Sequence, residues 1–182
     1  MLMLILKGVI VLLLLMVIGY KLLCIVEGDA DLILDKDTEK EFTKASREGD
    51  SVTIRRRLTF RNRGKQAAVV SDCIARTQLP YEQYDGIEAR GRVERVGEPR
   101  EDDYFEAVIV DPKESIDINV FITLKARKGQ SLELALSRMV DMPIDIIYTT
   151  FSRRPYEVVK DRIVMTAEEA AKSVGVKLVD ED

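Results

Sequence analysis

The chain has 182 residues, of which 33% are charged, and it carries a formal net charge of −4 and no histidine. Histidine is the usual general base and the usual zinc or copper ligand, so its absence excludes Ser-His-Asp and Cys-His catalysis and most transition-metal sites. The mildly acidic balance argues against nucleic-acid binding, which usually needs a basic domain. We therefore expect no cofactor and no nucleic-acid partner.

The first 26 residues form an apolar run that is interrupted only by two lysines and two glycines. As a helix that rises about 1.5 Å per residue, such a run covers the roughly 30 Å hydrocarbon core of a bilayer. Lys7 and Lys21 lie close enough to an end to reach the headgroups. A buried core helix would need a polar face, which this run lacks. The sequence therefore predicts a single membrane span from about Leu2 to Val26.

Basic residues at the two ends of the span predict its direction. The amino terminus and Lys7 precede the apolar core, whereas Lys21 alone follows it. This difference favours an amino terminus in the cytoplasm and a carboxy-terminal domain outside the cytoplasmic membrane. The run is too long for a cleaved signal peptide, and no Ala-x-Ala pattern follows it. Leu23 stands where a lipidation signal at Cys24 would need a small residue, so we expect an uncleaved signal anchor.

About 155 residues follow the span, enough for one domain with a core of its own. Composition divides this remainder into three parts. They are a polar linker with an edge strand at residues 27–50, a β-sandwich domain at residues 51–166, and a short helix with an acidic tail at residues 167–182.

The linker contains the spacing Asp35-x-Asp37-x-Glu39, which begins like a calcium-binding loop. Lys40 occupies the sixth position, where the sharp turn of such a loop needs glycine, and no glutamate follows at the twelfth position. We therefore expect a solvated acidic segment and no metal.

Period-two alternation predicts short strands along the rest of the chain. It is clean at residues 51–62 and strongest at residues 116–124. Arg56 is the exception, because it falls on the apolar face and implies a bulge, a strand end or a partner for its charge. Cys73 lies among apolar neighbours, so we expect a buried thiol and no disulfide with Cys24. Further strands are expected at residues 67–75, 87–94, 104–110, 143–152 and 158–165.

Two segments favour helices instead. From Ser131 to Val140 apolar residues recur at helical spacing, although Leu132, Leu134 and Leu136 also fit the alternation of a strand. Thr166 opens a capping-box pattern, and Gly175 is placed to end that helix. Seven or eight short strands with one or two short helices predict a mainly β fold, an antiparallel β-sandwich.

The stretch from Val52 to Val70 resembles the second and third strands of bacterial immunoglobulin-like modules, the group that includes cell-adhesion-related modules. Its alternating apolar residues run into Asn62-x-Gly64, a turn that often joins these strands in that group. The resemblance implies an immunoglobulin-like β-sandwich. The tryptophan and paired cysteines of antibody-type domains are missing, so an antibody-like domain is not implied.

Two groups of side chains are candidates for an interaction surface. The first group, Arg55, Arg57 and Arg61, shares one strand face and could meet an acidic protein, a phosphate-bearing envelope polymer or the headgroups. The alternative is a solvated face that neighbours such as Glu88 and Glu94 neutralise. The second group has the same alternative and consists of Arg153, Arg154 and Tyr156.

These observations favour a membrane-anchored, extracytoplasmic interaction module that is not an enzyme. A structural or accessory subunit of an envelope or secretion complex is the alternative. A histidine-independent carbohydrate enzyme is a third possibility, and it would need two carboxyl groups that converge in a cleft. Asp102 and Asp103 are a candidate pair, but both lie in one charged loop, which is typical of a solvated segment.

Overall fold

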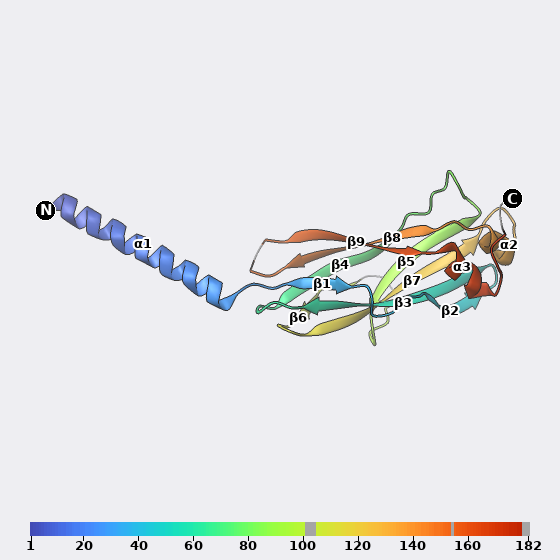
Figure 1. The fold of residues 1–182 in the computed structure, drawn as a ribbon, viewed down its shortest axis with the longest axis horizontal. Coiled ribbons are helices and arrows are strands. Elements are labelled where there is room, and N and C mark those ends of the chain that lie inside the picture. Colours follow the sequence, from blue (N-terminus) through green and yellow to red (C-terminus); the bar gives the residue numbers. More distant parts are fainter. Residues whose placement is uncertain (101–104, 154, 180–182) are drawn as a thin grey trace.

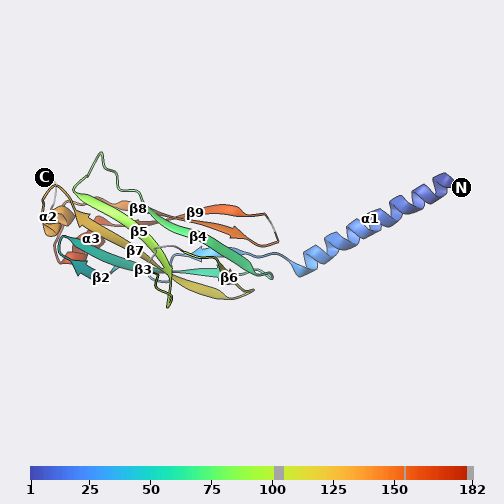
Figure 2. The same cartoon turned by 180° about the vertical axis from the view of Figure 1, so that it is seen from behind.

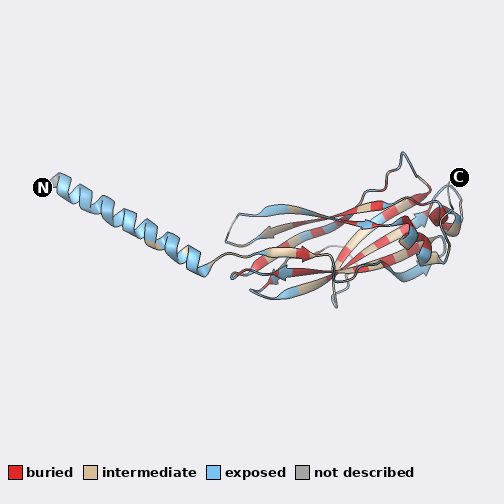
Figure 3. Cartoon of the chain, in the orientation of Figure 1, coloured by how far each residue is buried: buried red, intermediate tan, exposed pale blue. Residues whose placement is uncertain are grey.

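A computed structural model describes the chain except for residues 101–104, 154 and 180–182. Helix α1, Leu2–Glu27, projects away from a β-sandwich as a straight rod (Figure 1). Its segment Met3–Glu27 contains an 18-residue stretch with a mean hydropathy of 2.9, and none of that stretch is buried against the protein. Figure 3 shows this exposure along the whole rod. By length and composition, α1 is therefore able to cross a membrane.

The sandwich consists of two antiparallel sheets. The first contains five strands in the order β1-β3-β7-β5, with β2 also paired to β3. Long central strands form it because their apolar and polar residues alternate over twelve residues, which buries one face only. Its strands are β1 (Leu32–Asp35), β2 (Thr43–Glu48), β3 (Ser51–Asn62), β5 (Ile87–Arg95) and β7 (Ser115–Ala126).

The second sheet has the order β6-β4-β8-β9. Orders β1-β3-β7-β5 and β4-β8-β9 correspond to the A-B-E-D and C-F-G sheets of an immunoglobulin constant-type domain, with β2 and β6 as additions. The fold is therefore mainly β and immunoglobulin-like, as the sequence predicts. The strands of this sheet are β4 (Ala68–Thr77), β6 (Val108–Val110), β8 (Met142–Phe151) and β9 (Glu157–Met165).

The core lies between the two sheets. Most inward apolar side chains of β3 and β7 are completely buried, among them Ile54, Phe60 and Ile122. Phe60 meets Tyr148 of the opposite sheet edge to face, with 4.8 Å between the ring centroids. Cys73 is buried in the same core, and both cysteines are free thiols.

Two short helices close the end of the sandwich opposite α1 (Figure 2). Ser131 caps α2, Leu132–Ser137, by accepting a hydrogen bond from the N–H of Leu134, so this segment is a helix and not a strand. Thr166 and Glu169 form the capping box of α3, Ala167–Val174, and Gly175 ends it in the left-handed conformation.

The chain between α1 and β3 is more structured than a linker. It contains β1, as expected, but also β2, where the sequence predicts a loop. Residues 36–42, which we call the strap, connect β1 to β2 on the side of the sandwich where the edge strands β1 and β9 of the two sheets lie. Lys36 of the strap is paired with Asp161 of β9 at 3.1 Å, and the N–H of Phe42 donates to Glu169 of α3. The strap therefore connects both sheets.

Arg56 binds the strap to the inner side of β3. This arginine is buried on the inward face of β3, and it donates to the carbonyl oxygens of Glu39 at 2.8 Å and Lys36 at 2.9 Å. Its guanidinium also lies over the ring of Phe42, 5.7 Å from the centroid. Of the explanations that the sequence leaves open for Arg56, the structure thus selects a partner for its charge.

The predicted strand at residues 104–110 is shorter in the structure. Tyr104 lies outside the described residues, and of the remaining positions only Val108–Val110 pair with β4, whereas Phe105 is buried outside any strand. A large apolar residue can anchor a loop as well as a strand, so burial alone did not distinguish the two. The described part of the predicted acidic tail is held against the domain, because Val179 donates its N–H to the carbonyl of Ser137.

Candidate interaction surface

The junction between α1 and the sandwich is a short segment fixed by hydrogen bonds. Arg63 and Lys65, in the turn that follows β3, donate their N–H groups to the carbonyls of Asp31 at 2.8 Å and Asp29 at 2.9 Å. Gly64 lies so close that an added Cβ would be 2.4 Å from the carbonyl oxygen of Asp29. Only a glycine fits here, and the close approach fixes the path from the helix into β1.

The first predicted group of arginines lies on the outer face of β3. Its ion-pair partners are Asp35 and Glu39, which are closer in the sequence than the suggested Glu88 and Glu94. Arg61 donates to Asp35 of β1 at 2.8 Å. Glu39 of the strap lies 3.6 Å from Arg55 and accepts the backbone N–H of Arg57 at 2.9 Å. Hydrogen bonds from the N–H of Asp37 and from Arg61 lower the pKa of Asp35. The suggested neighbours Glu88 and Glu94 pair instead with Arg90 and Arg92.

A covered polar row runs across the centre of this face. Arg57 lies opposite Asn119 of β7, which in turn lies opposite Glu94 of β5. Arg57 Nε and Asn119 Oδ1 are buried, and neither has a hydrogen-bond partner in the described part of the chain. In the next row, Arg92 stacks over Phe121, with 4.9 Å to the ring centroid. These side chains cover one another at the centre of the face.

The second predicted group lies elsewhere, on the turn between β8 and β9. Arg153 forms an ion pair with Glu27 at the end of α1, and this hydrogen-bonded pairing raises the pKa of Arg153. Tyr156 is 74% exposed, and Arg154 lies outside the described residues. The described residues of the two groups therefore lie on two separate surfaces, and Arg153 of the second group contacts the helix that is able to span a membrane.

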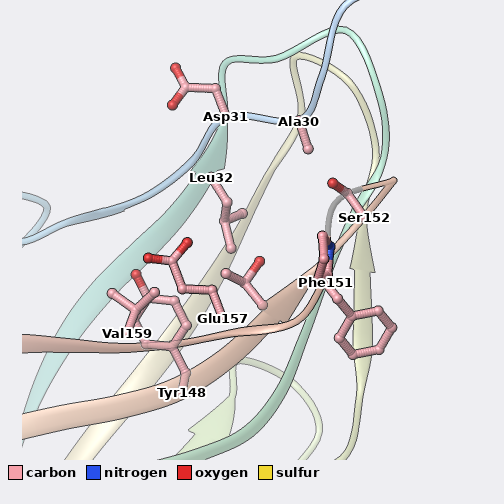
Figure 4. Close-up of a pocket in the computed structure, with 10 residues that line it drawn as sticks. Ala30, Asp31, Leu32, Tyr148, Phe151, Ser152, Glu157 and Val159 are labelled. Carbon is pink, nitrogen blue, oxygen red and sulfur yellow. The ribbon is translucent and has the colours of Figure 1, made fainter. Parts of the chain in front are cut away.

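Next to this turn, a groove opens between β1 and the β8–β9 hairpin (Figure 4). Its volume is about 300 Å³. Leu32 points into it from β1 and faces Tyr148, Glu157 and Val159, whereas Asp31 points away. The hydroxyl of Tyr148 donates to Asp161 at 3.2 Å, and burial is the main cause of the raised pKa of Tyr148.

Sequence reasoning missed this groove, because it depends on two strands that are far apart in the chain. One local signal was available: Tyr156 and Val158 are exposed apolar side chains, 74% and 62% accessible, where β9 begins. Exposed apolar side chains that lie close together mark a surface suited to contact with another molecule.

The structure also shows what surrounds the acidic residues that the sequence analysis considered for metal binding. Asp35 pairs with Arg61, and Glu39 pairs with Arg55 and accepts the backbone N–H of Arg57, so two of the three acidic residues of the calcium-like spacing serve contacts with β3. Within the described residues, no group of three or more Cys, Asp or Glu side chains converges as a metal site would need. The carboxylate pair Asp102 and Asp103 lies outside the described residues.

No known family model matches this chain, and no curated protein sequence matches it. The solved structures to which it is similar include the GAE domain of yeast GGA1 (TM-score 0.36, 6% identity, 74% of this chain and 90% of that one). They also include the GAE domain of GGA2p from Saccharomyces cerevisiae (0.34, 8%, 76% and 98%) and the CooA pilin subunit from enterotoxigenic Escherichia coli (0.34, 12%, 76% and 96%). The fold assignment rests on the strand order given above, and the function is argued from the geometry of this chain.

Proposed function

We propose that this protein is a single-span membrane protein whose β-sandwich lies outside the cytoplasm and acts as a non-catalytic interaction module for a protein or an envelope polymer. The observation that carries the proposal is the fixed junction between α1 and the sandwich. A helix with exposed apolar residues all around it is suited to lipid, and the hydrogen bonds at Asp29 and Asp31 set the sandwich directly on its end.

A fixed junction also limits what the sandwich can reach. A flexible tether would let a binding domain explore a large volume, whereas a short hydrogen-bonded connection keeps it at one height and in one orientation. Such a module suits a partner that is itself held at the membrane. The Arg153–Glu27 ion pair adds a second connection between α1 and the sandwich.

The same junction supports a second candidate, a structural or accessory subunit of an envelope or secretion complex. A rigid connection transmits the orientation of the span to the sandwich, which is useful where the span itself packs against other helices. Gly8 and Gly19 lie too far apart for a small-xxx-small helix interface, so we rank this role second.

Sidedness is tested with single cysteines in a Cys24→Ser background. Cys73 is 2% exposed and burial raises the pKa of its thiol, so it stays unreactive while the domain is folded. We expect Gln83→Cys to react with a membrane-impermeant maleimide on intact spheroplasts to the same extent as after permeabilisation. Reaction only after permeabilisation would place the sandwich in the cytoplasm and contradict the proposal.

Interaction is tested with a photo-crosslinking amino acid at exposed positions on different surfaces: Arg61 on the outer face of β3, Tyr156 beside the groove, and Gln83 at the end far from α1. A binding module gives discrete adducts at one of these surfaces and not at the others. Absence of adducts at all three positions, in cells that contain the natural partners, would contradict an interaction role.

A further inference from the structure

The groove beside α1 lies between two strand edges that no other strand occupies. Among the described residues, β9 pairs with β8 alone and β1 pairs with β3 alone. In an antiparallel edge strand, the N–H and C=O groups of alternate residues point away from the sheet. The groove is therefore bordered by two rows of backbone hydrogen-bonding groups.

The strap divides β9 into a covered and an open half. It is tied to Asp161 through Lys36 and to Glu169 through the N–H of Phe42. Beyond Asp161, the inward residues Ile163 and Met165 are buried, whereas none of the residues from Glu157 to Lys160 is buried. The open half of β9 faces β1 across the groove, so an added strand has about four residues, roughly 13 Å, available for pairing.

Apolar side chains form part of the floor of the groove, and one rim carries a negative charge. Leu32, Tyr148 and Val159 offer carbon surface, and the carboxylate of Glu157 faces the same space (Figure 4). An aliphatic side chain fits this floor, and a basic side chain on the same ligand would pair with Glu157. Both features can come from one extended segment, because its side chains alternate between the groove and the solvent.

We propose that an extended juxtamembrane segment of a partner membrane protein binds here as an additional strand along Glu157–Lys160 of β9, with an aliphatic side chain in the groove. The juxtamembrane assignment follows from the position of the site, since Ala30 in its lining is three residues beyond the end of α1. Strand addition obtains its affinity from backbone hydrogen bonds and its selectivity from the pocket. The inference rests on the proposed interaction function and names its site.

The test uses two valines on the same strand of the full-length chain. Val158 and Val164 are outward-facing residues of β9, 62% and 44% exposed, in the open and the covered half. With the photo-crosslinking amino acid at either position in native membranes, we expect a discrete protein adduct at Val158 with at least ten times the yield at Val164. Peptide mapping should locate the crosslinked segment next to a transmembrane helix of the partner.

Equal yields at the two valines, or an adduct with lipid only, would overturn the groove as a strand-binding site. If adducts form at Arg61 or Gln83 instead, the groove inference fails while the interaction function stands. If no exposed position gives an adduct, the proposed function itself fails. The two failures are thus distinguishable.

A proline pair tests whether the contact uses the backbone. Of the N–H groups of Val158 and Val159, one points to β8 and the other to the open side. Proline is tolerated where an edge strand exposes its N–H, so one of the variants Val158→Pro and Val159→Pro should melt like the parent. With the crosslinker at Tyr156, we expect that variant to lose the adduct at least tenfold. Retention of the adduct would exclude strand addition.

Discussion

The backbone N–H of Asp31 donates a hydrogen bond of 3.2 Å to Oδ1 of Asn62, so an asparagine inside the sandwich holds the chain that arrives from α1. The same oxygen accepts the N–H of Gly64 at 2.9 Å. The amide nitrogen of Asn62 donates to the carbonyls of Gln66 at 2.8 Å and Val110 at 2.9 Å. One side chain therefore joins the junction, the β3–β4 turn and β6.

Replacing Asn62 by alanine is expected to lower the free energy of unfolding by about 2–4 kcal/mol, because several buried backbone groups lose their partner at once. Urea unfolding of the full chain in detergent micelles, followed by circular dichroism, measures the loss. Asn119, the other asparagine of the chain, is the matched control. It is also buried, but its Oδ1 has no partner among the described residues, so Asn119→Ala should cost less than about 1 kcal/mol. Equal losses would refute the assignment.

Two adjacent arginines allow a similar comparison on the strap. Arg56→Met removes both side-chain donors to the carbonyls of Lys36 and Glu39, so we expect a loss of about 2 kcal/mol and at least tenfold faster amide exchange in residues 36–42. Arg55→Met removes only a partly exposed ion pair with Glu39 and should change stability by less than about 0.5 kcal/mol. Hydrogen exchange measured by mass spectrometry compares the strap in the two variants. Unchanged exchange in Arg56→Met would show that the strap is held by other contacts.

Asp145 gives a pH-dependent prediction. Its buried carboxylate accepts two hydrogen bonds from Arg162, at 2.7 and 3.2 Å, and the hydrogen bonding from Arg162 is the main reason why its pKa lies below the ordinary 3.8. Because the folded state favours the ionised form, this contribution is complete above the unfolded pKa and disappears as the pH falls through the lower, folded pKa.

We therefore expect Asp145→Asn to be less stable than the parent at pH 7 by about 1–2 kcal/mol, with the difference shrinking as the pH drops below about 4. Thermal melting across this range measures the effect. Glu82→Gln, at an exposed loop position, should follow the parent at every pH. A difference that is constant with pH would show that the pairing contributes through packing and not through ionisation.

Local patterns in the sequence predicted the elements whose signals are themselves local. Alternation identified β3 and β7, and the pattern from Thr166 to Gly175 identified both ends of α3. β2 was missed because its six residues, Thr43–Glu48, are all exposed and contain no large apolar side chain. It exists because β3 offers an edge with which to pair.

The candidate surfaces show why the ion-pair partners and the groove could not be predicted from the sequence. The residues that share the outer face of β3 could be predicted, but their partners Asp35 and Glu39 depend on where β1 and the strap run. The groove depends on the approach of β1 to β9, which strand order and register determine only after folding. Period-two patterns assign a residue to a face, and they carry no information about which edges lie side by side.

The rigid junction leads to a final prediction, in which Gly64 is the test residue. A Cβ at this position would lie 2.4 Å from the carbonyl oxygen of Asp29 and from the nitrogen of Asp31, two backbone atoms that cannot move aside independently. Gly64→Ala should therefore push the junction away from the β3–β4 turn and loosen the connection between α1 and the sandwich, while the core stays folded.

Spin labels on Ile25→Cys and Gln83→Cys, in the Cys24→Ser background and in lipid nanodiscs, report this connection as a distance distribution. We expect a narrow distribution in the parent and one at least twice as wide in Gly64→Ala. Gly8→Ala is the control, because an added Cβ there meets nothing within 4 Å. A distribution that is already wide in the parent would mean that the sandwich moves freely on its anchor, and the argument for a partner held at the membrane would lose its basis.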